Sequence, residues 1–148
     1  MKVINTNRKA SFDYFLLDRY EAGIVLTGTE IKSIRMNGLN LKDTYVRISN
    51  DMQVYVVNMH ISHYKFGNQF NHDETRERKL LLHKKEIKKI KDEVAQQHLT
   101  IVPTKIYFKE GRVKLEIATA KGKKNYDKRE SEKERDSNRE IAKALKNY

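Results

Sequence analysis

The sequence contains no cysteine and no long apolar segment. Without cysteine, the chain of 148 residues can form neither disulfides nor thiolate zinc sites. No run of about 18 apolar residues could cross a bilayer, and the N-terminus lacks the apolar stretch of a signal peptide. We therefore expect a cytoplasmic protein. Its length is enough for one domain with a sizeable core.

Motifs of the common enzyme classes are also missing. A phosphate-binding P-loop at Gly122-Lys123 would need a glycine where Ile117 stands. No pair of acidic residues is placed to predict a metal-dependent nuclease site. Only His60 and His63 among the five histidines are close in sequence. Two histidines without a third ligand are a weak metal signal, and ordinary loop histidines are the favoured interpretation. We expect no enzyme, no cofactor and no metal.

Charge is the informative part of the composition. The chain has 31 Lys and Arg against 20 Asp and Glu, a net charge of +11 and a pI near 9.7. Residues 76–91 alone hold 8 basic and 2 acidic side chains, and residues 121–148 hold 10 and 6. Such clustering favours a polyanionic partner. A membrane surface would prefer bulky apolar residues opposite the lysines, which these segments largely lack, so nucleic acid is the expected partner.

Short apolar segments predict a mainly β structure. Six strands are expected, over residues 12–17, 24–26, 45–48, 53–57, 100–109 and 112–120. The first two are separated by a break around Arg19 to Gly23. Turn residues at 49–51 and at Glu110-Gly111 predict two hairpins. From His60 to Arg78 no period is visible, so a long exposed loop is expected there.

Two helices are indicated by caps and by apolar spacing. Thr27 and Glu30 form a capping box, and the helix they begin should end near Asn37-Gly38 with Ile31 and Ile34 facing inward. A second helix should follow His83 as its cap, with an apolar stripe at Ile87, Ile90 and Val94 and a basic outer face.

Residues 121–148 differ from the rest of the chain. Between Lys121 and Glu140 the only large apolar side chain is Tyr126, so this segment cannot build a core. Acidic and basic residues recur there three positions apart, which favours a helix. Ile141, Leu145 and Tyr148 then form one apolar stripe. We expect a tail that is disordered when free and helical when bound.

These elements predict a six-stranded antiparallel barrel of the oligonucleotide-binding (OB) type over residues 1–120, with two or three helices. RNA recognition needs cations for phosphates and flat side chains for unstacked bases. Arg76, Arg78 and Lys79 are candidate phosphate contacts. Two alternatives stay open. The aromatic residues of loop 64–72 either stack on bases or close the end of the barrel, and the lysines of residues 84–91 either contact RNA or are merely solvated.

Five segments, in order across nearly the whole chain, carry a family resemblance. They are Asn7-Arg8-Lys9-Ala10, Tyr20-Glu21-Ala22-Gly23, Gly28 to Ser33, Arg76 to Leu82 with Glu86-Ile87, and Lys121-Gly122-Lys123-Lys124 with Asp127-Lys128-Arg129. Together they resemble the small protein B family, the partner of transfer-messenger RNA (tmRNA) in bacterial ribosome rescue. Glu74 departs from the family, which commonly has proline there, and this leaves the rigidity of that loop open.

The resemblance implies an OB-type barrel that binds the tRNA-like domain of tmRNA and replaces its missing anticodon arm. The implied RNA-binding residues are Asn7, Arg8, Lys9, Tyr20, Glu21, Gly23, Arg76, Arg78, Lys79 and Leu81. Asn7, Glu21 and Leu81 match three family residues of the RNA-binding surface. Each has an alternative: Asn7 as a turn former, Glu21 as a strand-end charge and Leu81 as a core residue.

The resemblance also implies a role for the tail in the empty mRNA channel of a stalled ribosome, with the ring of Tyr126 near the decoding centre. The implied ribosome contacts are Lys121, Gly122, Lys123, Lys124, Tyr126, Asp127, Lys128, Arg129, Ile141 and Leu145. Implied partners are tmRNA, the RNA of the small ribosomal subunit, and the complex of alanine-charged tmRNA with elongation factor Tu. The alternative is a general single-stranded RNA-binding protein of the OB type.

Overall fold

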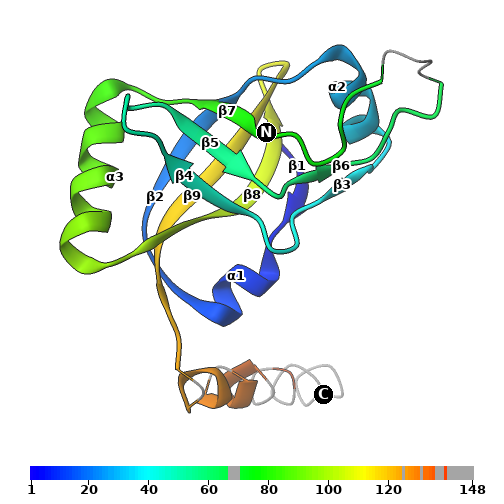
Figure 1. Ribbon diagram of the computed structural model, residues 1–148. Coiled ribbons are helices and arrows are strands. Elements are labelled where there is room, and N and C mark those ends of the chain that lie inside the picture. Colours follow the sequence, from blue (N-terminus) through cyan, green and yellow to red (C-terminus); the bar gives the residue numbers. More distant parts are fainter. Residues whose placement is uncertain (67–70, 125, 131, 136–138, 140–148) are drawn as a thin grey trace.

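The computed structural model describes all residues except 67–70, 125, 131, 136–138 and 140–148. The described chain is an antiparallel β structure flanked by helices (Figure 1). Its strands are β1 (Lys2–Thr6), β2 (Tyr14–Ile24), β3 (Leu39–Asn40), β4 (Tyr45–Ile48), β5 (Val54–Val57), β6 (His60–Ile61), β7 (Arg78–Leu81), β8 (Thr100–Lys109) and β9 (Arg112–Gly122). Its helices are α1 (Arg8–Asp13), α2 (Gly28–Arg35) and α3 (Lys84–Gln97), and residues 126–130 and 132–135 are also helical.

The strands pair in the order β1-β8-β4-β5-β7-β2-β9, and β8 also pairs with β9. Six strands therefore form a continuous ring. Strand β1 is not part of the ring and pairs with residues 105–108 of β8. The ring is uneven, because β2 and β8 pair with β9 over most of their length whereas β4 meets β8 at one residue pair, Val46 and Ile101. The prediction of a mainly β, antiparallel structure is confirmed.

The hydrophobic core fills this ring. Side chains of alternate strand residues point inward, as the fully buried Val54 and Val56 of β5 and Leu115 and Ile117 of β9 illustrate. Helix α3 adds Ile87 and Ile90 to the core, and α2 adds Ile34. The two helices lie on opposite sides of the strands (Figure 1).

Local sequence signals are confirmed where the residues involved are neighbours in the chain. At α2 the Thr27 backbone N–H donates to the Glu30 carboxylate at 2.8 Å, which closes the capping box. Beyond the end of that helix, Asn37 adopts a left-handed conformation with φ 62°. The predicted β4–β5 and β8–β9 hairpins both form. Glu110 and Gly111 turn the second with φ values of 52° and 76°, as a tight hairpin requires.

The predicted break around Arg19 to Gly23 is wrong, because β2 runs unbroken through it. A bulge between Leu16 and Arg19 shifts the register, after which β9 pairs with every residue as far as Gly23. Tyr20 and Ala22 face the core, so the strand alternates although its outward residues are charged. The prediction of six strands was too low, because β1, β3, β6 and β7 were not anticipated.

The segment from His60 to Arg78 is only partly the exposed loop that was expected. Ile61 is buried in β6, which pairs with β3. His72 is also buried, and its ring nitrogens lie 2.9 Å from Thr29 Oγ1 and 2.8 Å from the Ile61 carbonyl oxygen. These polar contacts attach the segment to α2 and β6. The pattern of apolar residues in the sequence does not reveal them.

Candidate RNA-binding surface

Glu21 occupies a fixed position on the outer face of β2. Its carboxylate accepts hydrogen bonds from the Tyr107 hydroxyl at 2.5 Å and from Lys109 Nζ at 3.3 Å. The Tyr107 hydrogen bond is the main reason why the pKa of Glu21 lies below its ordinary value. Burial and the neighbouring Glu21 carboxylate raise the pKa of Tyr107. Glu21 is thus an ionised acceptor held by two partners, with about 40% of its side chain exposed.

Strand register connects Glu21 with the N-terminal motif. Glu21 lies opposite Glu116 of β9, Glu116 opposite Lys105 of β8, and Lys105 opposite Thr6 of β1. Three strand spacings of about 4.8 Å put Thr6 roughly 14 Å from Glu21. Asn7 follows Thr6 directly. Two of the three family residues therefore lie at the two sides of one four-stranded layer.

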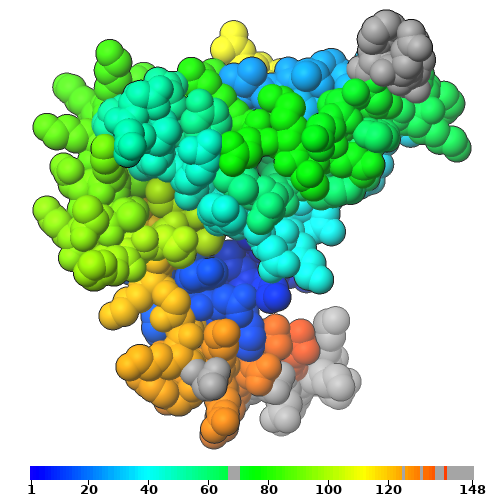
Figure 2. Space-filling view, in the orientation of Figure 1, coloured from blue at the N-terminus to red at the C-terminus, as the bar shows by residue number. Residues whose placement is uncertain are grey.

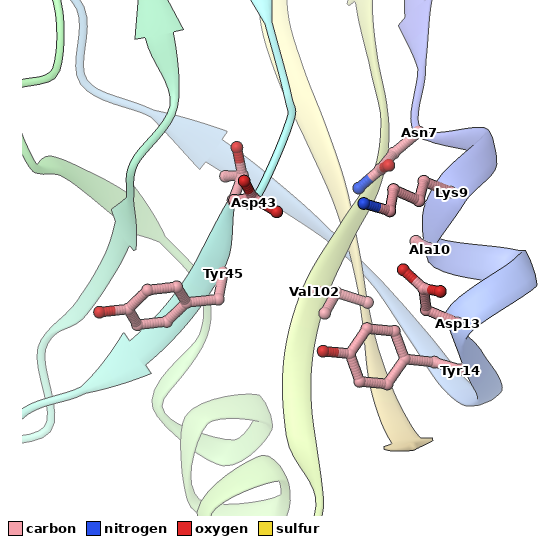
Figure 3. A pocket seen from close by; sticks show the side chains of 9 residues that line it. Asn7, Lys9, Ala10, Asp13, Tyr14, Asp43, Tyr45 and Val102 are labelled. Carbon is pink, nitrogen blue, oxygen red and sulfur yellow. The ribbon is translucent and has the colours of Figure 1, made fainter. Parts of the chain in front are cut away.

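Asn7 is anchored to β8 at the start of α1. Its backbone N–H donates to the Thr104 carbonyl at 2.7 Å, and its side-chain amide donates to the Pro103 carbonyl at 2.9 Å. Asn7 and Lys9 face a hollow that Asp43 and Tyr45 border from β4 and the segment before it (Figure 3). Arg8 and Lys9 are exposed. Helix α1 thus presents both cations to solvent.

Leu81, at the end of β7, is a surface residue. Its side chain is 53% exposed, so the alternative that it belongs to the core is wrong. In the register, Leu81 lies directly opposite Gly23 of β2. A Cβ atom added at Gly23 would stand 3.3 Å from the Leu81 Cβ, which is tighter than an ordinary contact. The missing side chain of Gly23 therefore makes room for Leu81, and these two residues and Glu21 form one surface.

Arg78 is not a phosphate contact, because the fold uses its guanidinium internally. The residue is fully buried and forms an ion pair with the Glu30 carboxylate. Its other nitrogens donate to the carbonyls of Met59 at 2.6 Å, Asp73 at 3.3 Å and Glu74 at 3.2 Å. The prediction is wrong because a basic cluster in sequence does not reveal which member turns inward.

Arg76 and Lys79, on either side of Arg78, are more accessible. Arg76 donates to Glu30 Oε1 at 2.6 Å, and 36% of its side chain is exposed. Lys79 is exposed and lies opposite Tyr55 in the register. Both can still meet a phosphate, although Arg76 is already bound to a carboxylate.

Tyr20 is also a core residue rather than a stacking platform. It is 9% exposed, and the Lys89 ammonium lies 5.7 Å from its ring centroid. Burial, followed by the nearby Glu93 carboxylate, raises the pKa of Tyr20 to about 12. A base cannot reach the ring, so the prediction of RNA contact is wrong. Alternation along β2 turns Tyr20 inward and Glu21 outward.

Several residues that complete this surface carry no signal in the family motifs. Tyr107 and Lys109 of β8 hold Glu21, and Lys114 of β9 lies opposite Gly23. The Arg35 guanidinium of α2 lies 5.4 Å from the Phe108 ring centroid. Alternation in residues 100–109 could have placed Lys105, Tyr107 and Lys109 on one face. Their pairing with Glu21 could not be anticipated, because it joins residues 86 and 88 positions apart.

The predicted ribosome contacts begin within the sheet. Lys121 and Gly122 are the last residues of β9 and lie opposite Phe15 and Tyr14. Lys123 donates from its backbone N–H to the Asp13 carbonyl at 2.8 Å and from Nζ to the Ser11 carbonyl at 3.1 Å. Strand β9 therefore extends two residues past the boundary at 120 that the sequence predicts.

Tyr126, Asp127, Lys128 and Arg129 belong to a helical segment that contacts the end of α1. Lys128 Nζ is 3.3 Å from an Asp13 carboxylate oxygen. The Lys124 backbone N–H donates to Asp127 at 3.2 Å. Tyr126 is 59% exposed, and Arg129 is exposed too. Ile141 and Leu145 lie outside the described residues.

A metal site and a membrane-spanning helix are both absent from the described residues. Those residues contain no group of three or more His, Asp or Glu residues that could hold a metal ion. His60 Nε2 lies 2.6 Å and His63 Nδ1 3.6 Å from the Glu74 carboxylate, and these contacts become ion pairs when the rings are protonated. No helix in the described part of the chain is long and apolar enough to span a membrane.

Comparison with known proteins identifies similar chains over nearly the full length. The model of the SmpB protein family matches residues 4–147. An SsrA-binding protein of Desulfitobacterium hafniense is 56% identical over 141 residues, which are 95% of this chain and 90% of the relative. The SsrA-binding protein of Thermosipho melanesiensis is 55% identical over 147 residues, 99% of each chain. A solved structure described as "tmRNA-SmpB: a journey to the center of the bacterial ribosome" is 43% identical, with a TM-score of 0.69 over 84% of this chain and 87% of that one.

Proposed function

The chain belongs to the SmpB protein family, and from this membership we propose that it binds the tRNA-like domain of tmRNA and brings it to stalled ribosomes for trans-translation. The family match over residues 4–147 carries the proposal, and it spans both the ring of strands and the tail. The ring of antiparallel strands supports a barrel of the OB type, a fold whose basic form has five strands. The protein would act in the cytoplasm, where bacterial ribosomes work, and by binding rather than by catalysis.

The body of the protein supplies the tmRNA contacts. Glu21 is a rigid, ionised acceptor that can take hydrogen bonds from base or ribose donors and so fix the orientation of the RNA. Arg8 and Lys9 beside Asn7, and Lys79 beside Leu81, can neutralise phosphates without fixing orientation. Asn7 to Lys9 and Glu21 to Gly23 would be contacted together by an RNA that lies across the four-stranded layer.

The tail would make the ribosome contacts. We place Tyr126 near the decoding centre, where its exposed ring can stack on a base while Lys124, Lys128 and Arg129 hold phosphates. By the same family membership, the RNA that the protein delivers would be alanine-charged tmRNA in complex with elongation factor Tu. The protein would then complete the shape of a tRNA whose anticodon arm is missing.

Binding selectivity tests the proposal against a general single-stranded RNA binder. The full chain should bind a transcript of the tmRNA tRNA-like domain at least about 1000-fold more tightly than an unstructured RNA of equal length at physiological salt. Fluorescence anisotropy between 50 and 300 mM salt would measure both affinities. A general binder would show equal affinities and the same steep salt dependence for both RNAs, and that result would overturn the proposal.

Gly23→Ala tests whether the close approach of β2 and β7 shapes the tmRNA surface. The added methyl group would push against Leu81, and we expect about fivefold weaker binding of the tRNA-like domain, roughly 1 kcal/mol. The free energy of unfolding should fall by no more than about 1 to 2 kcal/mol, because Leu81 can shift into solvent. Gly28→Ala is the control, since its added Cβ meets nothing within 4 Å. Equal affinities for the two variants would contradict this role of Gly23.

A further inference from the structure

Leu81 stands between two hollows in the surface. Strand β7 lies between β5 and β2 in the sheet, and Leu81 ends it. On the β5 side, a hollow of about 630 Å³ opens between the β4–β5 turn and the start of α3. On the β2 side, a hollow of about 240 Å³ opens between α2 and the β8–β9 turn. Leu81 lines both, and more than half of its side chain is exposed.

The hollow on the β5 side has buried apolar residues in its lining and a rim on which three lysines outnumber one carboxylate, that of Asp51. Val54, Leu80 and Ile87, all buried core residues, form part of its lining. Lys79, Lys84 and Lys88 are exposed around it, and none of the three forms an ion pair with another described residue. The side chains of α3 project outward beside this region (Figure 2). Such a hollow fits an apolar, flat group that carries negative charge.

The hollow on the β2 side offers the same combination. Its lining includes the Phe108 ring with the Arg35 guanidinium over it at 5.4 Å, and Lys114. Gly23 lies at its inner side and leaves room for Leu81. An arginine plane on an aromatic ring is a surface on which a nucleobase can stack, and Lys114 can meet its phosphate.

We propose that Leu81 is a wedge between two successive, unstacked nucleotides of the bound RNA, with one base seated in each hollow. This proposal rests on the function proposed above and specifies which feature of the RNA the surface takes. Exposed apolar side chains of this size separate neighbouring bases in other nucleic-acid complexes. The two separated bases gain surfaces on either side, and the basic rims neutralise the phosphates between them.

The occupant is single-stranded, because a paired strand cannot splay two bases apart. Sequence-specific RNA recognition generally uses unpaired loop nucleotides of this kind. Lys79, Lys84 and Lys88 would be enough to neutralise phosphates. Separation of the two bases gives the exposed leucine beside them a role that the lysines cannot fill. An acidic peptide could occupy the larger hollow, but it would not need a second hollow across the leucine.

Fluorescence of 2-aminopurine tests the wedge. Transcripts of the tmRNA tRNA-like domain would carry this base at one unpaired position at a time, and the full-length protein would be added to saturation. With the native chain, fluorescence should increase or decrease severalfold at two neighbouring positions, as the bases leave their stack. With Leu81→Ala, both changes should disappear and affinity should fall about tenfold, in line with the loss of one base-stacking contact.

Leu17→Ala is the matched control, because Leu17 is an equally accessible leucine, 44% exposed against 53% for Leu81, outside both hollows. It should show the same fluorescence changes and the same affinity as the native chain, and Leu81→Met should retain both fluorescence changes.

Tight binding by the native chain without a fluorescence change at adjacent positions would overturn the wedge while leaving tmRNA binding intact. The wedge would also be overturned if Leu81→Ala retained the fluorescence changes, or if Lys84→Gln/Lys88→Gln abolished binding of an acidic peptide and left binding of the RNA unchanged. Failure of the native chain to bind the domain would overturn the proposed function, and the wedge with it.

Discussion

A chain that ends at Gly122 is expected to bind tmRNA as the full chain does and to support no peptide tagging on stalled ribosomes. The cut preserves β9, whose last two residues still pair with Phe15 and Tyr14 of β2. A cut after Ala120, the boundary that the sequence predicts, would remove those two pairs. The contacts that the cut removes are expected to contribute little to the folded body. They include the partly exposed ion pair between Lys128 and Asp13, worth about 0 to 1 kcal/mol. They also include the hydrogen bonds of Lys123 to the carbonyls of Asp13 and Ser11, worth about 1 kcal/mol each.

The measurement is tagging of a nascent peptide on an mRNA without a stop codon, in a reconstituted translation system. In parallel, the affinity for the tRNA-like domain should stay within about twofold of the full chain, a change of roughly 0.5 kcal/mol or less. Tyr126→Ala in the full chain separates a role of the ring from a role of tail length. If the shortened protein tagged normally or failed to fold, the division of labour between body and tail would be refuted.

Replacing Glu30 by glutamine is expected to lower the free energy of unfolding by about 3 to 5 kcal/mol, the usual cost of leaving a buried charge without its partner. Glu30 is fully buried and accepts from the Thr27 N–H, from Arg76 and from Arg78. In the variant, the Arg78 guanidinium stays buried but loses its counter-ion. Because Arg78 also donates to three carbonyls of the 59–74 segment, that segment should loosen first.

Urea unfolding followed by circular dichroism would measure the change. Glu77→Gln is the matched control, because the ion pair of Glu77 with Arg47 lies on the surface, with both side chains more than 40% exposed. Its loss should cost less than about 1 kcal/mol. A similar small effect for both variants would show that the Glu30 pair does not hold the fold.

The same carboxylate predicts how stability depends on pH. Burial alone would raise the pKa of Glu30, but hydrogen bonds from Thr27, Arg76 and Arg78 outweigh it, so the pKa lies below its ordinary value in the folded protein. The stabilisation is therefore fully present above the unfolded-state pKa of about 4.3 and is lost as the pH falls through the lower folded-state value. In Glu30→Gln this part of the acid destabilisation should be absent, which urea titrations between pH 3 and pH 7 would reveal.

Features that depend on neighbours along the chain could be predicted from the sequence. The Thr27–Glu30 capping box, the β4–β5 and β8–β9 hairpins and the apolar stripe of α3 are set by residues a few positions apart. The short motifs of the family are equally local, and they led to the family that the comparisons confirm. Net charge also indicated a polyanionic partner without any structure.

Whether a given side chain points into the core or to the surface was decided only by the tertiary structure. Within Arg76 to Leu81, the pattern of charges does not distinguish the arginine that is buried from the lysine that is exposed, nor the inward Leu80 from the outward Leu81. Arg78 turns inward because Glu30, 48 positions away, is buried beside it. Leu81 can lie on the surface between two hollows because Gly23, on another strand, leaves room for it. Such choices depend on partners that only strand pairing brings together. The sequence therefore determined which residues are candidates for RNA contact, and the fold determined which of those side chains are exposed.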